Sequence, residues 1–281
     1  MAAPKEVLLT VTSLEREFIH LGVCPGDVIL LHSSLRSVGW VCGGPTVVVQ
    51  ALLAATGPDG TLVVPAQTPY NRHPERWNHD PVPPAWWPEI LRDLPAFDPQ
   101  LTPSAAMGAV AERVRTWPGA VRSAHPLTSF AAVGARAAEL LAVHDLSSLL
   151  GDRSPVAALE RAGAKVLLLG VGYESCTAFH LAESRLPGLP VVELTAVVRT
   201  ERGREWVAYE TIGLDARDFD LLGKAFESAC GEGGILTRKT VGAAVSRLFP
   251  LRDAVRFAEG WLPGRRPLHV PSAPGPEKEN R

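Results

Sequence analysis

Ala164-Lys-Val-Leu-Leu-Leu-Gly170 continues into Val-Gly-Tyr-Glu-Ser-Cys-Thr-Ala-Phe-His180-Leu-Ala-Glu183, and this stretch decides how the chain folds. The short apolar run, closed by a glycine, predicts a buried strand. After the glycines the sequence favours a helix over residues 177–186, on which His180 and Glu183 share a face because they are three residues apart. A histidine backed by a carboxylate, just past the carboxyl end of a strand, is where α/β enzymes place a general base.

This pattern has other interpretations. A histidine near a glutamate is also typical of a surface ion pair or of a hydrogen-bonded core histidine, so spacing alone leaves catalysis open. Cys176 lies one turn before His180. It is either a nucleophile that the histidine activates or a small core residue.

Strands and helices alternate over the rest of the chain. A strand at 27–32, a helix at 45–55 and a strand at 61–65 predict a βαβ unit, which needs a parallel sheet. Residues 191–199 and 205–211 predict an antiparallel hairpin. We therefore expect an α/β fold with a mixed, largely parallel central sheet, helices on both faces and a C-terminal antiparallel hairpin. The remaining expected elements are a strand at 131–134 and helices at 12–21, 104–115, 135–143, 154–162, 219–230 and from 240 onward.

The domain organisation follows from length and proline content. At 281 residues the chain suits one large α/β domain, which we expect over residues 1–262. Residues 67–103 form an insertion with nine prolines and three tryptophans. Proline excludes long helices there, and the tryptophans favour an ordered loop over a site rather than a solvated linker. Residues 263–281, rich in proline and charge, are expected to be a flexible tail.

Composition excludes several functions. With 28 basic and 30 acidic residues the net charge is −2, so we expect no nucleic-acid partner. The four cysteines are widely spaced, which indicates neither a metal knuckle nor a disulfide framework and suggests a reducing cytoplasm. The start of the chain does not resemble a signal peptide, and no apolar run approaches the roughly 20 residues that span a bilayer, so we expect a cytoplasmic protein with no membrane partner.

Polar side chains at the expected strand ends suggest ligand sites. Ser33 and Ser34 follow the first strand, where hydroxyls and backbone N–H groups could hold a ligand or stabilise an oxyanion. Basic residues near Ser104 could meet phosphates. Carboxylates of the insertion and the C-terminal half could attract a polycation, or they could simply form a solvated surface.

Several strings occur together in one order. They are His32-Ser-Ser-Leu-Arg-Ser-Val-Gly39, Gly57-Pro-Asp-Gly-Thr-Leu62, Thr102-Pro-Ser-Ala-Ala-Met-Gly108, Arg115-Thr-Trp-Pro-Gly119, Arg122-Ser-Ala-His-Pro126 and Gly172-Tyr-Glu-Ser-Cys-Thr-Ala-Phe-His-Leu-Ala-Glu183. Through them the chain resembles the aminoglycoside 3-N-acetyltransferase family over roughly residues 10–260. The resemblance implies an α/β fold distinct from the common acetyltransferase (GNAT) superfamily. It also implies acetyl-CoA as acetyl donor, the 3-amino group of a 2-deoxystreptamine aminoglycoside as acceptor, antibiotic resistance as the outcome, and no metal.

With that resemblance, each group of residues receives an expected role. His180 is the general base, oriented by Glu183. The residues expected to bind acetyl-CoA are Ser33, Ser34, Leu35, Ser104, Arg122, Ser123 and Phe130. The residues expected to bind the aminoglycoside are Asp80, Glu174, Glu210 and Asp215. A homodimer is allowed for, although the sequence does not decide the oligomeric state.

Three alternatives stay open at this point. Cys176 could carry the acetyl group as a thioester, with His180 as its base. An acetyltransferase of the same fold could act on another amine, in biosynthesis or self-protection. The chain could also be a non-catalytic module that binds a cationic sugar through its acidic residues.

Overall fold

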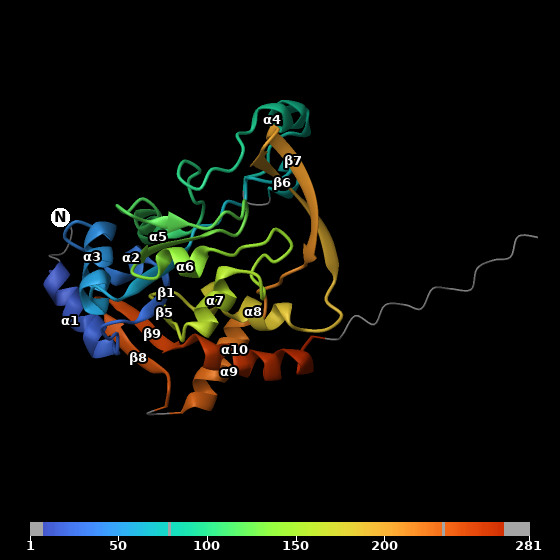
Figure 1. Ribbon diagram of the computed structural model, residues 1–281. Helices are drawn as coiled ribbons and strands as arrows, with labels where there is room; N and C mark the ends of the chain where they lie inside the picture. Colours follow the sequence, from blue (N-terminus) through green and yellow to red (C-terminus); the bar gives the residue numbers. More distant parts are fainter. Residues whose placement is uncertain (1–7, 78–79, 232–233, 267–281) are drawn as a thin grey trace, which may run out of the picture.

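The computed structural model of the protein describes residues 8–77, 80–231 and 234–266 (Figure 1). Within these residues a seven-stranded sheet has the order β3-β4-β2-β1-β5-β9-β8. Its strands are β1 (Val28–Ser33), β2 (Thr61–Pro65), β3 (Val121–Arg122), β4 (Phe130–Gly134), β5 (Lys165–Leu169), β8 (Thr237–Val241) and β9 (Ala244–Pro250). β1 pairs in parallel with β2 and β5, whereas β4 and β9 run the opposite way. Five of the seven strands thus share one direction, which confirms the mixed, largely parallel sheet.

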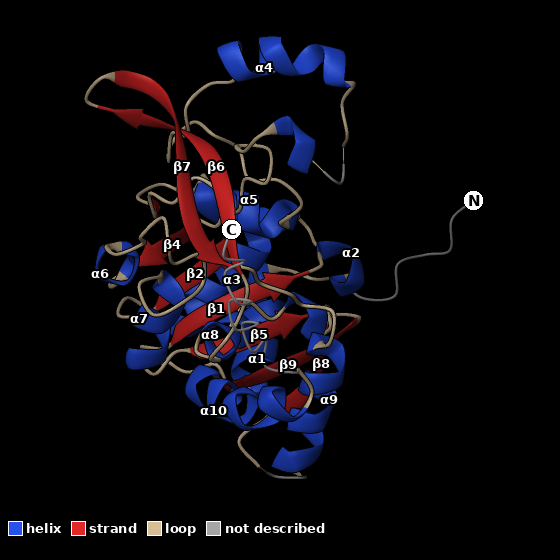
Figure 2. Cartoon of the chain, turned by 90° about the vertical axis from the view of Figure 1, so that its right-hand side faces the viewer, coloured by secondary structure: helices blue, strands red, loops and turns tan. Residues whose placement is uncertain are grey.

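Helices cover both faces of this sheet, as expected (Figure 2). On β1, Ile29 and Leu31 pack with α1, α3 and α5, whereas Leu30 packs on the opposite side with α7, α8, α9 and α10. Burial on both faces explains why this strand is apolar throughout. The helices of the described residues are α1 (Val11–Leu21), α2 (Leu35–Val38), α3 (Pro45–Thr56), α4 (Trp87–Asp93), α5 (Gly108–Arg115), α6 (Ala137–Leu141), α7 (Pro155–Arg161), α8 (Phe179–Ser184), α9 (Phe219–Cys230) and α10 (Leu251–Trp261), with 3₁₀ turns η1 (Pro74–Arg76), η2 (Pro84–Trp86), η3 (Tyr173–Ser175) and η4 (Leu262–Gly264).

The expected hairpin is present as β6 (Val191–Thr200) and β7 (Gly203–Ile212). It reaches away from the main sheet toward α4 of the insertion (Figures 1 and 2). The Phe97 N–H donates to the Val197 carbonyl at 3.1 Å, and the Trp206 indole donates to the Leu91 carbonyl at 2.7 Å. These contacts order the proline-rich insertion against the hairpin.

The prediction of a helix from residue 240 onward is wrong. The chain instead forms β8 and β9, and α10 begins at Leu251. Gly242 turns between the strands with φ +58°, and a Cβ there would lie 2.5 Å from the Val38 carbonyl oxygen, so this turn requires glycine. The buried residues Val241, Ala244 and Leu248 are spaced three and four apart, which imitates a helical face.

The helix expected at 104–115 is shorter and begins at Gly108. Ser104, expected as its first residue, lies before it, and the Ser104 hydroxyl donates to the Glu112 carboxylate at 2.6 Å. The chain turns into α5 through Ala106 and Gly108, which have φ values of +61° and +86°. Backbone in the left-handed region is unusual for alanine and marks a constrained turn.

The remaining differences concern the ends of elements. The helix expected at 177–186 is the six-residue α8 (Phe179–Ser184), and the one expected at 135–143 is α6. Residues 263–266 of the expected tail are described and held by contacts of Arg266, whereas residues 267–281 lie outside the described part. No described helix is both long and apolar enough to cross a membrane.

Candidate active site

A cavity of about 690 Å³ lies at the carboxyl ends of the parallel strands β1 and β2. Its walls come from four places: the end of β1 with the residues that follow it, the end of β2 with Gln67, the turn into α5 with the start of that helix, and the segment from Val171 to α8. This is the edge of a parallel sheet where α/β proteins bind ligands. Of the residues that sequence reasoning selected, it brings together Ser33, Ser34, Leu35, Glu174 and His180.

His180 and Glu183 form a close pair on α8. The Nδ1–Oε2 distance is 2.6 Å, with the His180 side chain 14% exposed and that of Glu183 1% exposed. Since the carboxylate accepts the hydrogen bond, Nδ1 carries the proton and Nε2 keeps its lone pair. Among the described residues no hydrogen bond is made to Nε2, and the ring lines the cavity. The imidazole also packs on Phe219, with centroids 4.6 Å apart. The arrangement suits proton abstraction from a bound group.

Glu183 is fixed by further donors at its other oxygen. Oε1 accepts the backbone N–H of Asp215 at 2.7 Å and also contacts the Arg266 guanidinium. The carboxylate of Asp215 itself pairs with Arg217. Asp215 therefore supports the pair through its backbone and is not placed on the wall of the cavity.

Two cavity residues that sequence reasoning did not select are His32 and Thr177. His32 Nε2 lies 3.3 Å from Thr177 Oγ1, and both residues line the cavity. Burial lowers the pKa of His32 to about 3, so its ring is neutral at physiological pH. The position of His32 directly before Ser33 was the available signal, but the pairing with Thr177 joins residues 145 apart and has no local signature.

The backbone N–H of Ser34 cannot serve as the expected oxyanion donor. It donates to the Leu169 carbonyl at 2.9 Å, extending the β1–β5 pairing. The Ser34 hydroxyl accepts the Ser37 N–H and caps the short helix α2. The hydroxyl of Thr177 lies on the same cavity.

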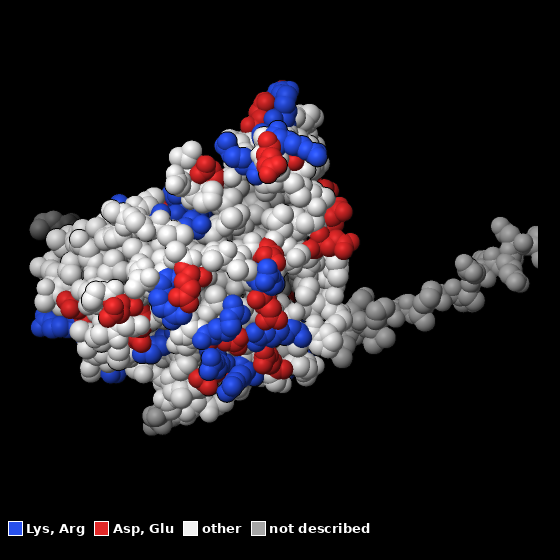
Figure 3. Space-filling model, in the orientation of Figure 1, with Lys and Arg blue, Asp and Glu red and all other residues white. Residues whose placement is uncertain are grey.

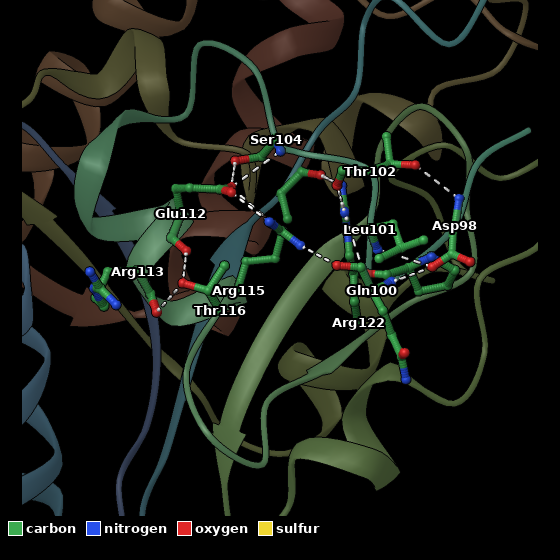
Figure 4. A network of polar contacts seen from close by, with 12 residues as sticks. Asp98, Gln100, Leu101, Thr102, Ser104, Glu112, Arg113, Arg115, Thr116 and Arg122 are labelled. Atoms are coloured by element: carbon green, nitrogen blue, oxygen red, sulfur yellow. Dashed lines mark hydrogen bonds and ion pairs between the residues drawn. The ribbon is translucent and has the colours of Figure 1, made fainter. Parts of the chain in front are cut away.

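Ser104 and Arg122, two of the residues expected to bind the donor, lie in a network of polar contacts outside the cavity (Figure 4). Ser104 and Arg115 both donate to Glu112 Oε2, at 2.6 and 2.9 Å. Arg122 donates to the Ala66 carbonyl at 2.6 Å and also contacts the Thr102 carbonyl, and burial lowers the pKa of its guanidinium to about 10. This network holds the 98–104 loop against β2 and β4, and a second cavity lies beside Ser104.

Ser123 and Phe130 are buried away from the cavity. The Ser123 hydroxyl lies 3.0 Å from Nδ1 of His144 and accepts the Phe130 N–H at 2.9 Å. The Phe130 side chain belongs to the core. Both residues stabilise β4 in this structure.

Two of the expected acceptor-binding carboxylates are exposed and lie outside the walls of the cavity. Asp80 is in the insertion, and Glu210 on β7 faces Glu193 on β6 across the hairpin. Acidic side chains gather along the edge of the molecule near this hairpin (Figure 3). Glu174, at η3, is the one selected carboxylate placed directly on the wall.

Cys176 is fully buried and does not line the cavity. Burial raises the pKa of its thiol to about 12, which leaves very little thiolate at neutral pH. A core role therefore fits Cys176 better than a nucleophilic one. Among the described residues no three His, Cys, Asp or Glu side chains are grouped so that they could hold a metal ion.

Comparison with known proteins agrees with this geometry. The sequence model of the aminoglycoside 3-N-acetyltransferase family matches residues 30–263. The chain belongs to this family. Its fold and its motifs are thus those of an acyltransferase, and the resemblance drawn from the motifs is confirmed.

Individual members of the aminoglycoside 3-N-acetyltransferase family are similar over most of their length. The aminoglycoside N(3')-acetyltransferase-like protein YokD of Bacillus subtilis is 38% identical over 254 residues, covering 90% of this chain and 92% of YokD. Its crystal structure superposes with a TM-score of 0.85 at 37% identity, covering 90% of this chain and 98% of that one. Aminoglycoside N(3)-acetyltransferase VII of Streptomyces paromomycinus is 35% identical, covering 90% of this chain and 91% of that protein. The structure of AAC-IIIb with CoASH superposes with a TM-score of 0.81 at 30% identity, covering 95% and 100% of the two chains.

Proposed function

We propose that the protein transfers the acetyl group of acetyl-CoA to the 3-amino group of a 2-deoxystreptamine aminoglycoside, with His180 as the general base. The observation that carries the proposal is the His180–Glu183 pair on the wall of the 690 Å³ cavity. Family membership and the CoASH complex of AAC-IIIb support the donor, and the names of the relatives support the acceptor.

The chemistry needs one base. The neutral amine nitrogen bonds to the thioester carbonyl carbon while Nε2 of His180 takes the amine proton. The C–S bond then breaks, and the imidazolium returns this proton to the sulfur of CoA. Glu183 accepts the Nδ1 hydrogen bond throughout, which stabilises the imidazolium. The Thr177 hydroxyl stabilises the oxyanion when the Nε2 proton of His32 is directed at its oxygen.

Substrate binding divides between the two sides of the cavity. Ser33, Ser34 and Leu35 contact the acetyl-CoA arm, and Glu174 attracts the cationic acceptor. Ser104, Arg122, Ser123 and Phe130 support the donor side by holding the loops and β4 in place. Asp80, Glu210 and Asp215 add negative potential that draws a polycation toward the site. Acetylation removes one positive charge from the drug and weakens its contacts with anionic RNA, which would confer resistance.

A thiol-release assay with acetyl-CoA and a panel of 2-deoxystreptamine aminoglycosides tests the proposal, with the acetylated position assigned by NMR. His180→Ala should lower kcat by about 10²–10⁴-fold, and the matched control His20→Ala, exposed on α1, should retain full activity. A variant at His180 that keeps more than about a tenth of kcat would exclude the general base. Acetylation at another amine would exclude the proposed regiochemistry, and aminoglycoside binding without thiol release would favour a binding module.

A further inference from the structure

Arg266 is the last described residue of the chain, and it contacts Glu183 of the His180–Glu183 pair at the oxygen that does not face His180. It follows η4 by two residues and lies beyond residue 263, where the match to the family model ends. Its guanidinium side chain is 16% exposed. Arg266 does not line the cavity, so any effect on the reaction must pass through other residues.

The guanidinium joins three neighbouring groups. One nitrogen, Nη1, contacts Oε1 of Glu183. Nε donates to the Asp218 carboxylate at 2.9 Å, and Nη2 contacts the same carboxylate and the Asp215 carbonyl. The Cζ atom of the guanidinium also lies 5.8 Å from the centre of the Phe219 ring, which packs on His180. Arg266 thus touches both the carboxylate and the aromatic ring that hold the imidazole.

Glu183 needs such a partner because its side chain is almost fully buried. A carboxylate in the interior remains charged only when donors or cations compensate the lost hydration. The Asp215 N–H supplies one neutral hydrogen bond, and Arg266 supplies the positive charge. Asp218 in turn pairs with the guanidinium and limits its rotation.

We propose that Arg266 is a positioning residue for acetyl transfer, which holds Oε1 of Glu183 and so aims Oε2 at Nδ1 of His180. The inference rests on the proposed function, in which His180 is the base. It assigns to the segment after α10 a part in catalysis without any contact with substrate.

The principal variants are Arg266→Gln, which removes the charge, and Arg266→Lys, which keeps a charge but loses the planar fork. Arg265→Gln is the matched control, because Arg265 is exposed and packs over the Trp261 ring. We expect Arg266→Gln to lower kcat by about 10-fold or more and to leave both KM values within about threefold. Arg266→Lys should recover part of the loss, and the control should match the wild type.

The pH profile separates positioning from a merely structural role. The charged groups around His180 are Glu183 behind it, Glu174 and Arg36 on the same cavity, and Arg266 with Asp218 beyond Glu183; His32 is neutral. Removing the cation leaves the carboxylates uncompensated and favours protonated His180. The acid limb of the kcat/KM profile of Arg266→Gln should therefore move to higher pH, by about 0.5–1 unit. An unmoved limb would contradict the proposal.

The double variant Arg266→Gln/His180→Gln separates the positioning role of Arg266 from the general-base role of His180. If Arg266 acts through the pair, Arg266→Gln should lower the residual rate no further in the His180→Gln background. An additive loss there would refute the positioning role while leaving His180 as the base. A fully active His180→Gln would refute the proposed function instead.

Thermal unfolding of each variant tests whether a loss of activity comes from a loss of folded protein. Asp218→Asn is a further variant, which weakens the ion pair with the guanidinium while Arg266 itself is kept. This variant should show a smaller loss of kcat in the same direction. A kcat of Arg266→Gln within twofold of the wild type, or a loss explained by the unfolded fraction, would overturn the inference.

Discussion

Lowering the pH from 7.5 to 5.5 should destabilise the protein through two buried histidines, His125 and His144. Their rings lie 4.5 Å apart: His125 belongs to the loop between β3 and β4, and His144 follows α6. Burial lowers the pKa of His125 to about 4 and that of His144 to about 3. Both histidines are therefore neutral in the folded protein at pH 5.5, whereas the unfolded chain would protonate them.

Burial is the main reason why the folded state resists protonation, and the hydrogen bonds that the two Nδ1 atoms accept act in the same direction, whereas those to the Leu146 and Leu149 carbonyls oppose it. Nδ1 of His125 accepts the backbone N–H groups of Leu127 and Thr128, both at 3.1 Å. Nε2 donates to the Leu146 carbonyl at 3.3 Å. If the ring took up a second proton, that proton would sit on Nδ1 and face these two N–H groups. The neutral tautomer with its proton on Nε2 is therefore favoured. In His144, Nε2 donates to the Leu149 carbonyl at 2.9 Å and Nδ1 accepts the Ser123 hydroxyl.

The magnitude follows from proton linkage. A base with a depressed folded pKa binds more protons when unfolded, so stability is complete above the unfolded value of 6.5 and falls as the pH drops toward the folded value. Between pH 7.5 and 5.5 each imidazole costs about 1.4 kcal/mol of unfolding free energy, so His125 and His144 together cost about 3 kcal/mol. His32, whose pKa burial lowers to about 3, adds about 1.4 kcal/mol by the same argument. Carboxylates add little in this range because they titrate at lower pH.

Urea unfolding at the two pH values measures this loss. His144→Gln removes one titrating ring. Between pH 7.5 and 5.5 the unfolding free energy of this variant should therefore fall by about 1.4 kcal/mol less than that of the wild type. His20→Gln, exposed on α1, should keep the full loss. Equal losses in the wild type and His144→Gln would show that His144 is not buried in its neutral form, and the reasoning would be refuted.

Three further predictions concern the cavity and its neighbours. Thr177→Val should lower kcat by about 10²–10³-fold with small changes in both KM values if its hydroxyl stabilises the oxyanion; steady-state kinetics with an unchanged rate would exclude this donor. Cys176→Ala should keep most activity, because burial raises the pKa of the thiol to about 12; an acetylated Cys176 peptide in mass spectrometry, with an inactive variant, would contradict direct transfer. Glu174→Gln should raise the aminoglycoside KM more than Glu210→Gln does, and added salt should weaken acceptor binding; if Glu210→Gln has the larger effect, the acceptor lies on the hairpin.

Local sequence patterns predicted those parts of the fold that local forces determine. β2 and α9 occur at the expected residues 61–65 and 219–230, and α7 lies within the expected range 154–162, where Ser154 caps it and Pro155 stands in its first turn. The β8–β9 pair was missed because its identity depends on pairing with β5, a partner about 80 residues earlier. The apolar spacing in this segment fits a helix as well as a strand, so the choice is made by tertiary contacts.

The candidate site was predictable to the extent that it is local. His180 and Glu183 are neighbours on one helix, and their contact follows from spacing. Arg266 and His32 reach the site across long sequence separations, which no short pattern records. The string Arg122-Ser-Ala-His-Pro126 contributes to the family resemblance, but its side chains here stabilise the loop and β4 rather than the cavity. A motif identifies the family without separating catalytic residues from structural ones.

The short length of α8 links the stability of the core to the position of the base. A six-residue helix has little stability of its own, so its place depends on packing. Phe179, Leu181 and Ala182 are fully buried around His180, and the ring of Phe179 meets that of Phe219 edge-on at 5.4 Å. Phe219 opens α9 directly after Asp218, the residue that holds Arg266. The start of α9 therefore fixes the imidazole by packing and its carboxylate by charge, so a shift of this one helix end would disturb both at once.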